Sequence, residues 1–189
     1  MMPGELARAL ESAARVLREG GIVAYPTEAV YGLGCDPRNR DACARLFLLK
    51  DRPPGHGVLL IGADFEQIAP YLDLAATPVA ALERAQATWP GAHSWILPRA
   101  ADAPAWLGGE HTGIGVRVTA HPPAVALCRA FGAALVSTSA NRHGESPTRS
   151  ADEVRVAFGD AVEIVDAPLG GLDRPTPIRD AISGKTLRS

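Results

Sequence analysis

Three polar clusters and one isolated arginine in this chain consist of residue types that bind anions. Each cluster is made of hydroxyl groups, an amide or cations, and each follows an apolar run or the end of a predicted helix. They are Thr27 and Tyr31; Lys50 and Arg52; Ser137, Thr138, Ser139 and Asn141; and the single Arg117. Such side chains, without a pair of general-acid carboxylates, suit an anionic, polyphosphate-like ligand.

Each cluster also has a structural explanation. Lys50 and Arg52 could form an exposed helix terminus, where cations interact favourably with the helix dipole. The hydroxyls of 137–141 could hydrogen-bond their own backbone in a turn. Lys50 and Lys185 are the only lysines among 19 basic residues, which suggests that position 50 needs a compact ammonium group. Taken together, the clusters favour a binding site over four unrelated surface features.

Common nucleotide and hydrolase motifs do not account for these residues. Ser183-Gly184-Lys185-Thr186 ends like a Walker A loop, but Arg179 stands where its first glycine belongs. Gly32-x-Gly34 and Gly113-x-Gly115 lack the third glycine of the dinucleotide fingerprint. No GxSxG surrounds Ser137 or Ser139, so a serine hydrolase is poorly supported.

Composition restricts the class of protein. The 189 residues are 47% hydrophobic and 21% charged, and the net charge is −2. This charge argues against a protein that coats nucleic acid, although a local basic groove is compatible with it. No apolar run is long enough for a membrane span, and no signal peptide is evident, so we expect a cytoplasmic location. Three cysteines without CxxC spacing and five scattered histidines predict neither a disulfide framework nor a metal held by protein ligands.

Hydrophobic periodicity predicts alternating strands and helices in one α/β domain over residues 1–189. The predicted strands are 22–25, 58–61, 94–97, 114–118, 134–136 and 162–165, and a terminal hairpin turns at Ser183-Gly184. The predicted helices are 5–19, 41–50, 64–71, 77–89, 122–131 and 150–158. Their expected caps are Asn39 or Asp41, Thr77 with Pro78, and a Ser150–Glu153 capping box. Pro53 and Pro54 should prevent the second helix from continuing.

The motifs resemble those of the YrdC domain family. Its three signatures are matched by Pro26-Thr27-Glu28-Ala29-Val30-Tyr31-Gly32-Leu33-Gly34, by Lys50-x-Arg52 and by Ser139-x-Asn141. The similarity continues through Trp89-Pro90-Gly91, Val116-Arg117-Val118 and Ile178-Arg179-Asp180, and so covers essentially the whole chain. The length is similar to that of the short bacterial form. The resemblance implies a twisted, mixed α/β sheet with flanking helices and a concave, basic ligand groove.

The resemblance also implies an activity, L-threonylcarbamoyladenylate synthesis. L-Threonine, bicarbonate and ATP with Mg²⁺ would give threonylcarbamoyl-AMP and pyrophosphate, and downstream tRNA-modifying proteins would transfer the product to the tRNA adenosine beside the anticodon. The implied catalytic residues are Lys50 and Arg52. The residues implied for ATP are Lys50, Arg52, Thr138, Ser139, Asn141 and Arg188. Those implied for L-threonine are Thr27, Arg117, Ser137 and Thr176, with Tyr31 shaping the wall.

Departures from the family pattern affect the threonine pocket. Ala29 stands where many relatives have threonine, and Ile61 where they have histidine. Pro90-Gly91-Ala92-His93-Ser94 keeps a hydroxyl but loses a proline. Two alternatives remain open: a non-catalytic module that binds tRNA or double-stranded RNA, and carbamoyl transfer as in the larger relatives. The first would need aromatic residues that stack on bases or extra cations, and the chain has only 5% aromatic residues and a net charge of −2, which argues against it.

Overall fold

The computed structural model describes residues 3–52 and 57–188. The predicted stop at Pro53 and Pro54 lies outside the described residues. The helices are α1 (Pro3–Arg18), α2 (Arg40–Leu49), α3 (Phe65–Ile68), α4 (Val79–Gln86), α5 (Ala105–Gly108), α6 (Pro122–Phe131) and α7 (Ala151–Phe158), with 3-10 turns η1 (Ala69–Tyr71) and η2 (Gly159–Ala161). The strands are β1 (Val23–Pro26), β2 (Tyr31–Gly34), β3 (Leu59–Gly62), β4 (Ser94–Pro98), β5 (Gly113–Val118), β6 (Leu135–Ser139), β7 (Glu163–Ile164), β8 (Ile178–Asp180) and β9 (Thr186–Arg188).

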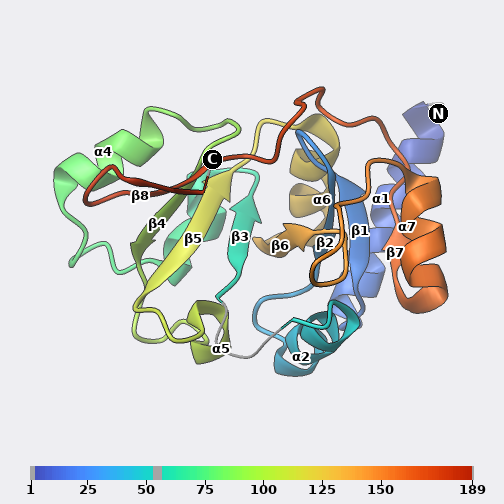
Figure 1. Cartoon of the computed structure of the whole chain (residues 1–189), viewed down its shortest axis with the longest axis horizontal. Helices are drawn as coiled ribbons and strands as arrows, with labels where there is room; N and C mark the ends of the chain where they lie inside the picture. The colour runs from blue at the N-terminus through green and yellow to red at the C-terminus, as the bar shows by residue number, and fades with distance from the viewer. Residues whose placement is uncertain (1–2, 53–56, 189) are drawn as a thin grey trace.

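These strands form one mixed sheet, in the order β7-β1-β2-β6-β3-β5-β4-β8-β9 (Figure 1). β3 pairs in parallel with β5 and antiparallel with β6, so the centre of the sheet contains both kinds of ladder. The terminal hairpin is confirmed: β8 and β9 pair antiparallel, and Gly184 in the turn has a φ of 75°. The predicted α/β class and mixed sheet are therefore confirmed.

The first signature motif folds differently from the sequence prediction. No strand is predicted over 31–34, but Gly32 and Gly34 lie in β2, which pairs back onto β1. The turn is only 27–30, where the backbone N–H of Thr27 donates to the carbonyl of Val30 at 3.0 Å. Glycine is needed at position 34 of β2, because a Cβ there would come within 2.7 Å of the Val136 carbonyl oxygen and within 2.9 Å of the Tyr25 ring.

Two of the predicted helix caps are observed and one is wrong. The side chains of Asn39 and Ser150 accept N–H bonds at the starts of α2 and α7. The prediction that Thr77 caps the next helix is wrong, since α4 begins only after Pro78. The Thr77 hydroxyl donates instead to the carbonyl of Asp73 at 2.6 Å, which satisfies it outside the helix.

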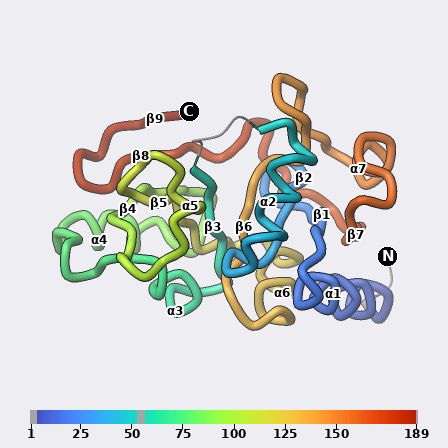
Figure 2. Tube along the Cα trace, turned by 90° about the horizontal axis from the view of Figure 1, so that it is seen from below, coloured from blue at the N-terminus to red at the C-terminus, as the bar shows by residue number. Residues whose placement is uncertain are grey.

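The helices leave part of one sheet face uncovered. α1 and α6 pack side by side over the β1 end of that face, around an apolar cluster that includes Leu127 (Figure 2). The opposite face carries the larger apolar cluster, which includes side chains of α2, α4 and α7. Val116 of β5 points into this larger cluster, so by strand alternation Gly115 and Arg117 face the other way. There they line an open cavity.

Candidate active site

A cavity of about 440 Å³ lies over β3, β5, β4 and β6 and is bordered by the β8–β9 hairpin. Most residues predicted for ATP and L-threonine line it, although they come from segments far apart in the chain. These are Thr27, Arg52, Arg117, Ser137, Thr138, Ser139, Thr176 and Arg188. Lys50 and Asn141 are not part of the lining. Tyr31 does form part of the wall, and its hydroxyl donates to the carbonyl of Ala167 at 3.0 Å.

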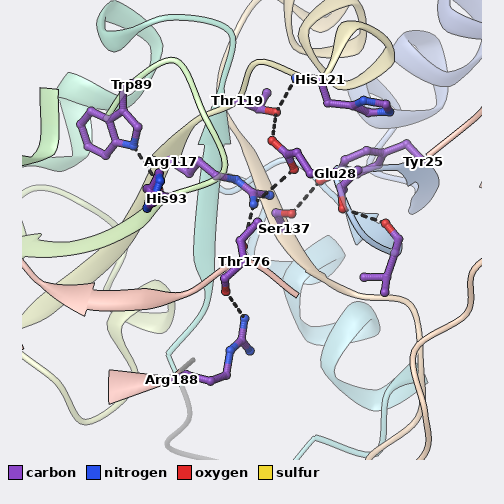
Figure 3. Close-up of polar contacts among 12 residues, drawn as sticks. Tyr25, Glu28, Trp89, His93, Arg117, Thr119, His121, Ser137, Thr176 and Arg188 are labelled. Atoms are coloured by element: carbon purple, nitrogen blue, oxygen red, sulfur yellow. Dashed lines mark hydrogen bonds and ion pairs between the residues drawn. The ribbon is translucent and has the colours of Figure 1, made fainter. Parts of the chain in front are cut away.

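Arg117 is paired with a carboxylate inside the protein. Its Nη1 lies 3.3 Å from Glu28 Oε2, and both side chains are buried. The same Nη1 donates to the hydroxyl of Thr176 at 2.7 Å, and the other Glu28 oxygen accepts from Thr119 at 2.8 Å (Figure 3). The guanidinium is thus held through Nη1 by Glu28 and Thr176, while its buried Nε–H lacks an acceptor among the described residues.

Glu28 belongs to the site through its pair with Arg117, although it is not among the residues predicted to bind ATP or L-threonine. It stands in the first signature motif, beside Thr27, so its position was visible. What the sequence did not show is that its partner would be Arg117 on β5, which lies 89 residues further along the chain. The feature of the sequence that could have indicated this pair is an acidic residue directly after a buried strand, because a buried charge without a partner is costly.

Lys50 acts on the backbone behind the cavity wall. It is 5% exposed, and its Nζ donates to the carbonyls of Ser139 and of Asn141, the latter at 2.6 Å. Burial, together with the nearby charge of Arg52, lowers the pKa of Lys50 to about 8. Ser139 Oγ in turn donates to Asn141 Oδ1 at 2.6 Å. Lys50 and Asn141 therefore fix the end of β6 from which Ser139 faces the cavity.

Two further guanidinium groups border the cavity. Arg52 Nη1 lies 3.4 Å from Thr138 Oγ1, and Nη2 donates to the carbonyl of Gly57. Arg188 Nη2 donates to the carbonyl of Thr176 at 3.3 Å. Burial lowers the pKa of Arg52, and the charge of Arg188 lowers it further; the pKa of Arg188 is lowered by burial and then by Arg117. No Asp or Glu is among the described residues that line the cavity, so an anionic ligand would relieve this mutual repulsion.

The small hydroxyls have fixed partners. The Tyr25 hydroxyl donates to Ser137 Oγ at 2.9 Å, and burial raises the pKa of Tyr25, so it stays protonated as the donor. The Thr27 hydroxyl donates to the carbonyl of Val30 at 2.7 Å. Among the departures from the family pattern, Ala29 lines the cavity, whereas Ile61 lies in an apolar cluster.

This arrangement suits transfer between anionic groups. Three arginines can neutralise phosphate and carboxylate oxygens, and the hydroxyls can orient them. Phosphoryl and nucleotidyl transfer depend mainly on positioning and on neutralisation of charge, with little need for a protein nucleophile.

Comparison with known proteins identifies the family. A model of the Sua5/YciO/YrdC family, described as "Telomere recombination", matches residues 15–189. This chain belongs to the Sua5/YciO/YrdC family. The resemblance to the YrdC domain family is thereby confirmed.

Individual members of the Sua5/YciO/YrdC family agree with the fold. The chain is 54% identical over 187 residues to the threonylcarbamoyl-AMP synthase of Halorhodospira halophila, covering 98% of this chain and 97% of that protein. It is similar to P. abyssi Sua5 complexed with L-threonine, with a TM-score of 0.84 and 31% identity over 90% of this chain and 50% of that chain. E. coli YciO matches with a TM-score of 0.79 and 28% identity, over 92% of this chain and 84% of that one. The enzyme name of the curated relative does not favour the non-catalytic RNA-binding alternative.

Three features of the described residues bear on the class of protein. None of the described helices is long and apolar enough to cross a membrane. Within residues 3–52 and 57–188, no group of three or more His, Cys, Asp and Glu side chains is placed to hold a metal ion. Cys35, Cys43 and Cys128 are free and buried.

Proposed function

We propose that this protein is an enzyme that makes threonylcarbamoyl-AMP and pyrophosphate from L-threonine, bicarbonate and MgATP. The observation that carries the proposal is the cavity itself, where three arginines and several hydroxyls meet without a carboxylate among the described lining residues. The name of the relative that is 54% identical over almost its whole length supports the reaction. The L-threonine complex of P. abyssi Sua5 supports the amino-acid substrate.

The reaction needs two bond-forming steps. The amine of L-threonine first combines with bicarbonate to give a carbamate, with loss of water. A carbamate oxygen then attacks the α-phosphorus of ATP, and the bond from that phosphorus to the bridging oxygen breaks to release pyrophosphate. The protein's contribution is to hold the two anions close together and to neutralise them.

The cavity residues divide between the two substrates. Arg117 pairs with the threonine carboxylate, because its guanidinium edge fits two oxygens, and Thr27, Ser137 and Thr176 complete that end. Arg52 and Arg188 neutralise the triphosphate, while Thr138 and Ser139 donate to phosphate or ribose oxygens.

Lys50 and Asn141 act on ATP from behind the wall. Lys50 holds the carbonyls that position Ser139 and adds a positive charge near Arg52. Mg²⁺ arrives as part of the ATP complex, since no carboxylate among the described cavity residues offers it a ligand. The product would leave the cavity for cytoplasmic tRNA-modifying proteins, and tRNA itself is a further candidate partner.

The decisive experiment measures pyrophosphate release by the purified protein with MgATP and bicarbonate, with and without L-threonine. We expect release that depends on L-threonine and is not supported by L-alanine. The Arg52→Ala variant should lose roughly 10–150-fold in turnover, the value of a charge-assisted contact. Arg129→Ala, an exposed arginine on α6 outside the cavity lining, should behave like the wild type. Release that is independent of L-threonine, or full turnover by the Arg52 variant at saturating ATP, would contradict the proposal.

A further inference from the structure

One glycine in the floor of the cavity has no evident structural reason to be glycine. Gly115 lies within β5, between β3 and β4, and lines the cavity. Glycine inside a strand weakens it, because the residue has no side chain to pack and loses more backbone freedom on folding. Such a glycine often marks a place where a ligand or another backbone comes close.

The other cavity glycines on or beside the sheet are explained by their protein neighbours. A Cβ on Gly113 would meet Ile96 Cγ2 at 2.7 Å, and a Cβ on Gly57 would meet the carbonyl oxygen of Gly108 at 2.8 Å. At Gly32 the nearest atom would be Thr27 Cγ2, at 3.2 Å. At these positions the packing of the fold excludes or disfavours a side chain.

At Gly115 neither the packing of neighbouring atoms nor the backbone conformation requires glycine. The three nearest atoms to a Cβ there all belong to Leu59, at 3.7 Å, which is ordinary van der Waals contact. Its φ is also outside the positive region that favours glycine. The fold would therefore accept alanine at position 115, and the added methyl group would project into the cavity beside Leu59.

The position of Gly115 shows which part of a ligand it would meet. Arg117 lies two residues further along the same face of β5, about 7 Å away at the usual rise of a strand. Arg52 lies in the opposite direction along the sheet. It donates to the carbonyl of Gly57, which comes two residues before Leu59, and Leu59 is the residue of β3 that pairs with Gly115. Gly115 thus lies between the arginine that we assign to the threonine carboxylate and the arginine that we assign to the phosphates.

We infer that Gly115 determines the fit of the two reacting groups: its missing side chain leaves room where the threonine carbamate and the α-phosphate of ATP meet. The inference rests on the proposed function and adds to it a residue that is not among the predicted site residues. It predicts opposite effects of one substitution on stability and on activity. A merely structural glycine would lower both together.

The test compares Gly115→Ala with Gly113→Ala. Gly115→Ala should melt at the same temperature as the wild type or higher, because alanine restricts the unfolded chain. Its threonine-dependent pyrophosphate release should nevertheless fall by about 10-fold or more, as expected for overpacking of a fitted site. Gly113→Ala should melt at a lower temperature, since its methyl group collides with Ile96.

The outcomes separate the inference from the proposed function. Turnover by Gly115→Ala within about 2-fold of the wild type would overturn the inference alone, and so would a loss of stability as large as that of Gly113→Ala. A wild-type protein without threonine-dependent release would refute the proposed function, and the inference with it.

Discussion

Replacement of Glu28 by glutamine tests the charge pair at the centre of the site. The glutamine would keep the shape of the side chain and an oxygen for the Thr119 hydroxyl, but would leave Arg117 without its carboxylate. The side chains of Arg117 and Glu28 are 5% and 9% exposed, so the pair is buried. Removal of one partner of a buried pair costs about 3–5 kcal/mol of unfolding free energy. For a chain of this size, each kcal/mol lowers the melting temperature by about 2–4 °C, so we expect a fall of about 6–20 °C.

L-Threonine should partly reverse this effect. In the proposed site its carboxylate pairs with Arg117 and so supplies the charge that Glu28→Gln removes. Thermal unfolding followed by circular dichroism, with and without saturating L-threonine, should therefore show a larger upward shift for the variant than for the wild type. The double variant Glu28→Gln/Arg117→Met should be less destabilised than the sum of the single changes, because no buried charge remains unpaired.

A matched control is available on the surface. Asp152→Asn breaks the exposed pair between Asp152 and Arg155 on α7, and exposed pairs contribute little to stability, so this variant should melt with the wild type. The reasoning would be refuted if Glu28→Gln melted within about 2 °C of the wild type. It would also be refuted if L-threonine stabilised both proteins equally.

Other predictions follow from single contacts. The value of kcat/KM should fall above about pH 8 as Lys50 loses its proton. The pKa of Lys50 is lower in the folded chain than its ordinary value of 10.5, so the folded protein becomes more stable relative to the unfolded chain as the pH rises from about 8 to 10.5. A loss of activity in this pH range would therefore not reflect unfolding. A profile that stayed flat to about pH 9.5 would contradict this role. Thr176→Val should reduce kcat/KM for L-threonine by roughly 10–150-fold, because Arg117 loses a charge-assisted contact. If steady-state kinetics gave the wild-type kcat/KM, Thr176 would have no such role. Asn141→Ala should raise the KM for ATP by about 2–12-fold, since Ser139 loses the acceptor that orients it; an unchanged KM would show that this bond does not matter.

Local sequence patterns predicted helix starts and turns correctly where the structure depends only on residues close together in the chain. The helix start at Asn39, the cap at Ser150 and the turn at Gly184 depend on neighbours within a few residues, and the structure has them as expected. The start of α4 was missed because Thr77 has a competing local acceptor, the carbonyl of Asp73. β2 was missed because its glycines imitate a turn, although Gly34 is in fact required by the Val136 carbonyl and the Tyr25 ring, and a Cβ on Gly32 would crowd Thr27.

The sequence by itself determined which types of residue make up the candidate site. The arginines, hydroxyls and glycines of the motifs already indicated an anionic ligand, because charge and hydrogen-bonding capacity are properties of the residue types. Eight of the ten predicted ligand residues line one cavity, since the strands on which they lie are neighbours in the sheet or border its open face.

Only the tertiary structure decided the partners. That Glu28 pairs with Arg117, that Tyr25 donates to Ser137 and that Lys50 holds carbonyls at the end of β6 all depend on contacts across 89 or more residues. The free space next to Gly115 is likewise a property of the packed sheet, because it depends on the distance from Gly115 to Leu59 and to the cavity walls. The order of strands sets such distances, and no local pattern in a chain specifies that order.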